Sequence, residues 1–301
     1  MHAGREVTDF GWTSWILASA VLLALYDLAK KASVRDNAVL PVLLCSSACG
    51  CAAYLLGMGL GGRWAARDAI TAELVGLAAA KSLIVATSWV FTFRALRTLP
   101  ISIATPIRAS APALVFVAAF FLYGEVPTLV QAVGMLAVFG GYFVFSWAGR
   151  HEGIDFFRNR AVWCAIAGAG LSAVSSIWDK YVFQVRGADV EATQLLFQIG
   201  LVVIYALLLC AQRVVAPSAH GFTWRWTIPL VGTLLAGADW LYFKGLAIEG
   251  VPISVASLMR RFSVVITFVL GARFFHETNL VRKALALAAI LFGITLLCLG
   301  N

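Results

Sequence analysis

The sequence is short of charge. Charged residues make up 13% of its 301 residues and hydrophobic residues 61%, whereas a soluble protein carries about 25% charged residues. This shortage and the repeated apolar runs argue against a soluble fold, and they predict a helical protein that crosses a membrane several times. The strands of a membrane β-barrel would be about ten residues long and would alternate in polarity, which this sequence does not show.

Several chemical signatures are also missing. The sequence has no GxxxxGK phosphate loop, so it encodes no ATP-driven pump, and it has neither the HExxH nor the GxSxG motif of hydrolases. Its six cysteines form no CxxC pair, and Cys45, Cys49 and Cys51 are expected to be small packing residues of one helix. We therefore expect no catalytic residue, no metal and no cofactor.

The net charge of +8 does not indicate nucleic-acid binding, because the basic residues lie singly or in pairs between apolar runs. Charged loops and a few charges inside the membrane explain it more simply. The partners that we expect are the lipid bilayer and a small anionic molecule, with no nucleic acid. The oligomeric state stays open, and a monomer is compatible with the sequence.

What the sequence does contain is a series of ten apolar segments. Each has about 18–25 residues, enough for a helix to cross a hydrocarbon core of about 30 Å. The connections are short, and the longest, Ala148–Arg160, lies near the middle of the chain. The segments are Trp12–Ala29, Val39–Leu60, Ala72–Leu96, Ile101–Tyr123, Thr128–Trp147, Ala161–Phe183, Ala192–Gln212, Thr227–Ile248, Pro252–Phe275 and Leu280–Gly300.

The two halves of the chain are similar to each other at a constant offset of 152 residues. The offset aligns Pro100-Ile-Ser with Pro252-Ile-Ser and Arg108 with Arg260. A repeat of five spans is odd, so the second copy would cross the membrane in the opposite sense, as in secondary transporters. The sequence thus predicts an all-α integral membrane protein with ten transmembrane helices in two inverted five-helix repeats. The predicted repeats are residues 1–149 and 150–301.

Three arginines, Arg108, Arg260 and Arg261, lie inside predicted spans. An arginine at the bilayer centre costs about 2.5–3.5 kcal/mol on insertion scales, so such residues usually serve a function. We interpret them as an anion-binding site in a water-filled cavity. The alternative is that each one pairs with a carboxylate and serves only packing.

Lys81 and Asp239 are further ionisable residues deep in spans. Asp239 could neutralise one arginine, leaving a surplus of about three positive charges that suits a phosphate or a dicarboxylate. Thr92 and Lys244 are equivalent positions of the two repeats, and Tyr242 is a candidate cavity residue. The predicted substrate-binding residues are Arg108, Arg260, Arg261, Lys81, Asp239, Thr92, Tyr242 and Lys244.

Asp27 and Asp179 are equivalent residues of the first and sixth segments. Either could carry a proton during transport. Because Lys30 and Lys31 follow Asp27, and Lys180 follows Asp179, the sequence favours a structural ion pair at each helix end. Both aspartates remain candidates for proton coupling.

Two motifs flank the fourth segment, Ala95-Leu96-Arg97-Thr98-Leu99-Pro100 before it and Gly124-Glu125 after it. With ten spans in two repeats, this pattern resembles the drug/metabolite transporter superfamily, EamA type, over essentially the whole chain. Ile107-Arg108-Ala109-Ser110-Ala111-Pro112 is similar to the Ile-Lys-Ala-x-x-Pro motif of plastid triose-phosphate translocators. Ser254-Val255 through Arg260-Arg261 is similar to their Ser-Val … Lys-Arg run. That resemblance implies that these basic residues hold a phosphate, with arginine in place of lysine changing the geometry.

Together these patterns predict a secondary transporter of the inner cell membrane. It would move a small organic anion, such as a phosphorylated metabolite, by alternating access through a central arginine-lined cavity. Three alternatives stay open. An exporter of neutral or cationic metabolites, amino acids or drugs would have neutralised arginines, with Asp239 in reach of Arg260. A lipid-phosphate flippase would use the same arginines, and a membrane enzyme would act on lipid.

Overall fold

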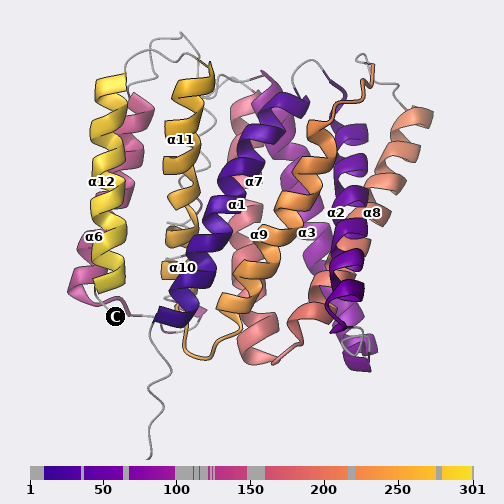
Figure 1. The fold of residues 1–301 in the computed structure, drawn as a ribbon, viewed down its shortest axis with the longest axis horizontal. Helices are drawn as coiled ribbons and strands as arrows, with labels where there is room; N and C mark the ends of the chain where they lie inside the picture. Colours follow the sequence, from indigo (N-terminus) through magenta and orange to yellow (C-terminus); the bar gives the residue numbers. More distant parts are fainter. Residues whose placement is uncertain are drawn as a thin grey trace, which may run out of the picture.

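The chain is helical throughout the part that the structure describes, and this part contains no β-strand (Figure 1). The computed structural model describes residues 10–34, 37–63, 68–98, 111, 115, 121–122, 124, 126–147, 160–215, 221–275 and 280–299. The helices are α1 (Phe10–Val34), α2 (Val39–Leu60), α3 (Ala72–Thr98), α6 (Leu129–Trp147), α7 (Arg160–Lys180), the π-helical η2 (Tyr181–Val185), α8 (Val190–Val215), α9 (Thr227–Leu246), α10 (Ile253–Arg260), α11 (Phe262–Phe275) and α12 (Leu280–Leu299).

Several of these helices can cross a membrane. Five of the described segments are long and apolar enough, which supports the prediction of an integral membrane protein. The fourth predicted segment, Ile101–Tyr123, lies almost wholly outside the described residues, and Arg108 is one of its residues. The ten-span architecture therefore stays a prediction. The five candidate spans are Gly11–Val34, Val39–Leu60, Ala72–Ala95, Arg160–Val185 and Val190–Arg213.

Proline and glycine mark the helix ends. Pro41 and Pro229 lie in the first turns of α2 and α9, and Pro252 directly precedes α10, where the missing proline N–H breaks no helical hydrogen bond. Gly187 follows η2 with φ 59°, and Gly250 lies between α9 and α10 with φ 83°. Only glycine adopts these values without strain, so both positions make sharp turns between neighbouring helices.

The ninth predicted segment is broken, which corrects the single span Pro252–Phe275. Helix α10 ends at Arg260, Arg261 adopts a turn, and α11 begins at Phe262. The Arg261 N–H donates to the carbonyl oxygen of Leu258, three residues earlier, at 2.9 Å. In an α-helix the acceptor would be four residues earlier, so the chain makes a tighter turn here. No glycine or proline marks this break in the sequence, so the apolar run alone could not reveal it.

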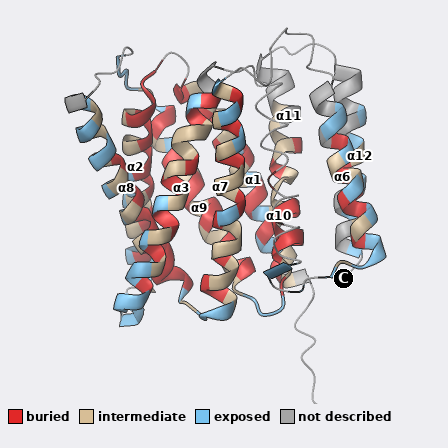
Figure 2. Ribbon diagram, turned by 180° about the vertical axis from the view of Figure 1, so that it is seen from behind, coloured by how far each residue is buried: buried red, intermediate tan, exposed pale blue. Residues whose placement is uncertain are grey.

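The helices pack in pairs that are distant in the sequence. Helix α1 packs along α9, α3 packs along α7, and α2 and α8 contact each other as well as α9 and α3 respectively. Helices α6 and α12 form a further pair at one edge of the molecule (Figure 1). The buried residues gather between α1, α2, α3, α7, α8 and α9, and exposed residues lie at the edges (Figure 2). This centre is where the candidate site lies.

Two glycines allow α2 and α9 to touch through their backbones. A Cβ atom at Gly232 would overlap the carbonyl oxygen of Ser46, and one at Gly50 would lie 2.6 Å from the carbonyl oxygen of Gly232. Small residues are the usual means by which membrane helices approach this closely. The contact joins the two halves of the chain.

Gly232→Ala is expected to destabilise the protein, because the added methyl group forces α2 and α9 apart. Overpacking of this kind costs about 1–3 kcal/mol, and the thermal unfolding midpoint of the purified protein in detergent measures it. Gly76→Ala on α3 is the matched control, since nothing lies within 4 Å of its Cβ position. Equal midpoints for the two variants would contradict the close contact.

Candidate functional site

A cavity of about 140 Å³ lies between α1, α3, α7, α8, α9 and α10. It is close in volume to a cavity of about 150 Å³ that accommodates benzene in another protein, so in this form it suits a small metabolite. Six of the eight residues that the sequence predicted for substrate binding line it, and Asp179 joins them. These six are Lys81, Thr92, Asp239, Tyr242, Arg260 and Arg261.

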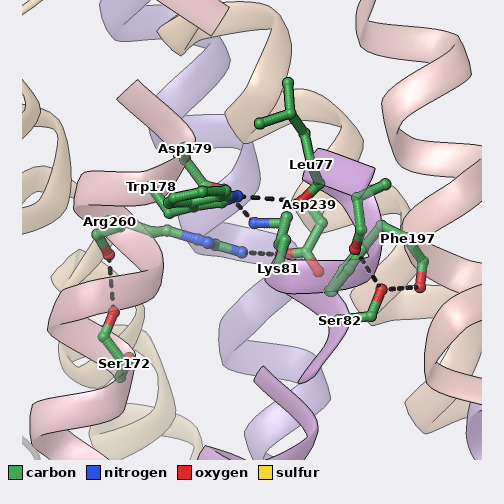
Figure 3. A network of polar contacts seen from close by, with 11 residues as sticks. Leu77, Lys81, Ser82, Ser172, Trp178, Asp179, Phe197, Asp239 and Arg260 are labelled. Carbon is green, nitrogen blue, oxygen red and sulfur yellow. Dashed lines mark hydrogen bonds and ion pairs between the residues drawn. The ribbon is translucent and has the colours of Figure 1, made fainter. Parts of the chain in front are cut away.

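Arg260 on α10 forms an ion pair with Asp239 on α9 (Figure 3). The sequence predicted that Asp239 would neutralise one arginine, and this contact confirms it. The guanidinium carbon of Arg260 also lies 4.4 Å from the centre of the Tyr242 ring, a cation–π contact. The Arg260 Nε is buried and has no hydrogen-bond partner among the described residues. One donor of this guanidinium group therefore remains available to a ligand.

Lys81 on α3 and Asp179 on α7 form a second ion pair next to the first (Figure 3). Their side chains are only 3% and 5% exposed. The Lys81 Nζ lies 4.5 Å from the centre of the Phe243 ring and 4.8 Å from that of Phe197. Aromatic rings and a carboxylate thus replace the water that this ammonium group would otherwise bind.

The partner of Asp179 corrects the favoured prediction of a helix-end pair with Lys180. Because α7 packs along α3, Asp179 faces Lys81, which is 98 positions away in the sequence. Trp178 supports this packing through a hydrogen bond from its Nε1 to the carbonyl oxygen of Leu77 at 3.1 Å. Since Lys81 has a carboxylate of its own, the expected surplus of about three positive charges falls by one.

Asp27 forms the structural ion pair that the sequence favoured. Asp27 and Lys30 form an ion pair at 2.5 Å within α1, and Asp27 is not among the residues that line the cavity. Lys30 does line it, although sequence reasoning did not select it as a site residue. Its Nζ lies 4.5 Å from the centre of the Tyr26 ring and 5.7 Å from that of Phe93.

Lys244 lies away from the cavity, in contrast to its predicted role. Its Nζ is 2.7 Å from a carboxylate oxygen of Glu191 on α8, and it is not among the cavity-lining residues. Thr92, the equivalent residue of the first half, does line the cavity. The two repeat mates therefore face different surroundings, because a carboxylate on the neighbouring helix attracts Lys244.

Sequence reasoning missed a row of serine hydroxyls. Ser172, Ser175 and Ser176 line the cavity from α7, together with Asp179. Their spacing of i, i+3, i+4 and i+7 places all four on one face of a helix. This polar stripe in an otherwise apolar segment was the available signal. Ser88 and Ser257 add hydroxyls from α3 and α10.

Arg108 lies outside the described residues, so its predicted place opposite Arg260 stays a prediction. Within the described ranges, the His, Cys, Asp and Glu side chains form no group of three that could hold a metal ion. The cavity therefore offers ion pairs, hydroxyls and aromatic rings as its means of binding a ligand.

The first half of the chain is similar to a known protein family. Residues 10–147 match the EamA-like transporter family. A crystal structure of another protein, 17% identical in sequence, superposes with a TM-score of 0.75 over 96% of this chain and 98% of that one. At this identity the similarity shows the fold alone. A search of curated proteins gives no match.

Proposed function

We propose that this chain, whose residues 10–147 match the EamA-like transporter family, is a secondary transporter of the inner cell membrane for a small organic anion. The family match of residues 10–147 and the five helices long and apolar enough to cross a membrane support a membrane transporter. The substrate class and the mechanism are inferred from the cavity. The partners in this proposal are an anionic small molecule and the lipid bilayer.

The architecture that we propose is two inverted repeats, residues 1–149 and 150–301. Helix packing supports it, because the offset of 152 residues converts the pair α1–α9 into the pair α7–α3, and α2–α9 into α8–α3. Close contacts follow the same rule to within one residue. A Cβ at Gly168 would lie 2.5 Å from the Thr92 Oγ1, and one at Gly245 would lie 2.9 Å from the Ile16 Cδ1. The offset relates position 168 to 16 and position 93 to 245.

The charge of the cavity carries the proposal of an anionic substrate. Four cationic side chains line it, against the two carboxylates Asp179 and Asp239, and Asp27 beside the lining pairs with Lys30, so the positive charges exceed the carboxylates by one. The unpartnered Nε of Arg260 supports the same view, since a buried charged donor gains most from an anionic acceptor. The cationic residues are Lys30, Lys81, Arg260 and Arg261.

Alternating access would use this charge from both repeats. In the proposed cycle the substrate anion binds Arg260 and Arg261 on one repeat and Arg108 on the other, which favours an occluded state. Position 87, the equivalent of Asp239 in the first repeat, is a threonine. The first repeat therefore has no carboxylate at the position equivalent to the one that neutralises Arg260.

A zwitterion such as an amino acid is the second candidate substrate. The Arg260–Asp239 ion pair favours it, because a neutralised arginine is the feature that the alternative of a neutral or cationic exporter predicted. An ammonium group could bind Asp239 while the carboxylate of the same molecule binds Arg260 or Arg261. The organic anion and the zwitterion both carry an anionic group, a carboxylate or a phosphate, and only the zwitterion also carries an amine.

Counterflow in proteoliposomes is expected to select ligands that carry an anionic group. The purified protein would be tested with two pairs, lactate against alanine, which are of equal size, and a sugar phosphate against the free sugar. Uptake of lactate and the sugar phosphate supports the organic anion, whereas uptake of alanine alone selects the zwitterion. Transport of the free sugar or of a simple amine, with none of the anions, would refute the proposal.

A further inference from the structure

The helices around the cavity fall into two groups. We call α1, α2, α9, α10 and α11 the first group, because α1 packs on α9, α10 and α11, and α2 packs on α9. Helices α3, α7, η2 and α8 form the second group, in which α3 packs on α7 and α8. The groups meet along α2 and α8, and the cavity is lined by α1, α9 and α10 from one group and by α3, α7 and α8 from the other.

The connection between α9 and α10 lies at the lower end of the bundle in Figure 1, and a glutamine of the second group contacts it. Gln184 lies in η2, and its side-chain Nε2 donates hydrogen bonds to the carbonyl oxygens of Leu246 at 3.0 Å and Val251 at 2.9 Å. These two carbonyls flank the connection between α9 and α10. The carbonyl of the last residue of a helix has no partner within that helix, so Gln184 supplies one from the opposite group.

An ion cluster joins the groups at the same end. A carboxylate oxygen of Glu191, near the start of α8, lies 2.7 Å from the Nζ of Lys244 and 3.8 Å from a guanidinium nitrogen of Arg63. Lys244 is close to the end of α9, and Arg63 follows α2. The hydroxyl of Tyr54 on α2 donates to the backbone carbonyl of Glu191 at 3.4 Å. Glu191 of the second group thus contacts three residues of the first group.

Aromatic packing closes the space between these contacts and the cavity. Phe243 of α9 lines the cavity and is 1% exposed. Its ring centre lies 4.9 Å from that of Phe183 in η2 and 6.3 Å from that of Phe197 on α8. Phe183 directly precedes Gln184 in the sequence, so a movement of η2 away from α9 would break the ring contact and the hydrogen bonds at the same time.

We propose that Gln184, Glu191 and Phe243 form a gate that closes the cavity toward this end of the bundle. The inference rests on the proposed function, because a gate presupposes alternating access. Its contacts suit a structure that opens in every cycle. Hydrogen bonds and partly exposed ion pairs contribute little net stability, and the side chains of Lys244 and Arg63 are about one-third exposed, so water can replace their partner.

A nearby ion pair provides the matched control. Arg186, which follows η2, pairs with Glu73 at the start of α3. Both residues belong to the second group, so this pair would remain closed when the groups separate. Arg186→Gln removes a charge at the same end of the molecule without breaking a contact between the groups.

The test is hydrogen exchange of the full-length protein in lipid nanodiscs, read by mass spectrometry. Gln184→Leu is expected to raise the exchange rate of the amides of Ala247, Ile248 and Val251 about tenfold, as expected for two lost hydrogen bonds. These amides donate within the α9–α10 connection, so their exchange reports its opening. Exchange near Glu191 should rise as well, although Gln184 does not touch that residue. Arg186→Gln should change neither region.

Glu191→Gln is the second variant, and it is expected to raise exchange in the α9–α10 connection from the opposite side of the gate. It carries the test alone if Gln184→Leu does not fold. Changes confined to the mutated contact would show that Gln184 merely caps α9, and would overturn the gate, as would unchanged exchange. The readout needs no substrate. A gate that opens in a protein that transports no anion would refute the substrate proposal and leave the gate standing.

Discussion

Arg260→Gln is expected to abolish anion counterflow in proteoliposomes and to leave the protein folded. Arg260 contributes a charge and a free Nε donor to the cavity, and a hydrogen bond to a charged group contributes about 1.5–3 kcal/mol. Its loss would lower the affinity for the substrate about ten- to a hundredfold. In transport, the substrate would also no longer bridge the two repeats. Initial uptake rates and the unfolding midpoint together measure the two effects.

Two controls separate the charge from the packing. Arg260→Lys keeps the charge but loses the planar geometry of the guanidinium group, so partial transport is expected. Arg260→Gln leaves Asp239 without its partner, and Arg260→Gln combined with Asp239→Asn removes both charges of the pair. The double variant should be folded and inactive toward anions. If Arg260→Gln transported the anion at the rate of the unchanged protein, the anion site would be refuted.

The helices themselves could be predicted from the sequence because their lengths are set by the membrane. Helix α2 begins and ends at the predicted residues, since Val39–Leu60 is an unbroken apolar run between polar or glycine-containing turns. The cavity position of Arg260 also followed from depth alone. A residue some seven positions inside an apolar span lies about 10 Å below its end, where only a cavity or a partner makes a charge tolerable.

The direction in which a side chain points could not be predicted in the same way. A helix that is apolar on all sides has no polar face to indicate which way it turns. Lys244 is the repeat equivalent of Thr92, which lines the cavity, but Lys244 faces Glu191 on α8. Asp179 lies one residue before Lys180, yet its partner is Lys81 on α3. Both contacts depend on which helices are neighbours, and an internal repeat indicates equivalent positions without showing these neighbours.

Lys81→Met is expected to destabilise the folded protein by about 3–5 kcal/mol, because it leaves the carboxylate of Asp179 buried without a cation. Both side chains are almost fully buried, so water cannot replace the lost partner. Chemical unfolding of the purified protein measures the change. Lys81→Met combined with Asp179→Leu should recover most of the stability, since apolar residues of similar volume replace a buried ion pair at little cost. Methionine also preserves contact with the rings of Phe197 and Phe243.

The same double variant decides whether Asp179 carries a proton. If the pair is only structural, the ratio of gradient-driven uptake to exchange at equal pH is unchanged in the folded double variant, even where the loss of Lys81 from the cavity slows both. If Asp179 couples transport to protons, exchange between equal pH values persists while uptake driven by the gradient is lost. Asp27→Asn is the matched control, because Asp27 is the repeat mate of Asp179, pairs with Lys30 and does not itself line the cavity. Full stability of the single variant Lys81→Met would instead show that the buried pair contributes nothing to folding, and that Asp179 is neutral in the folded protein.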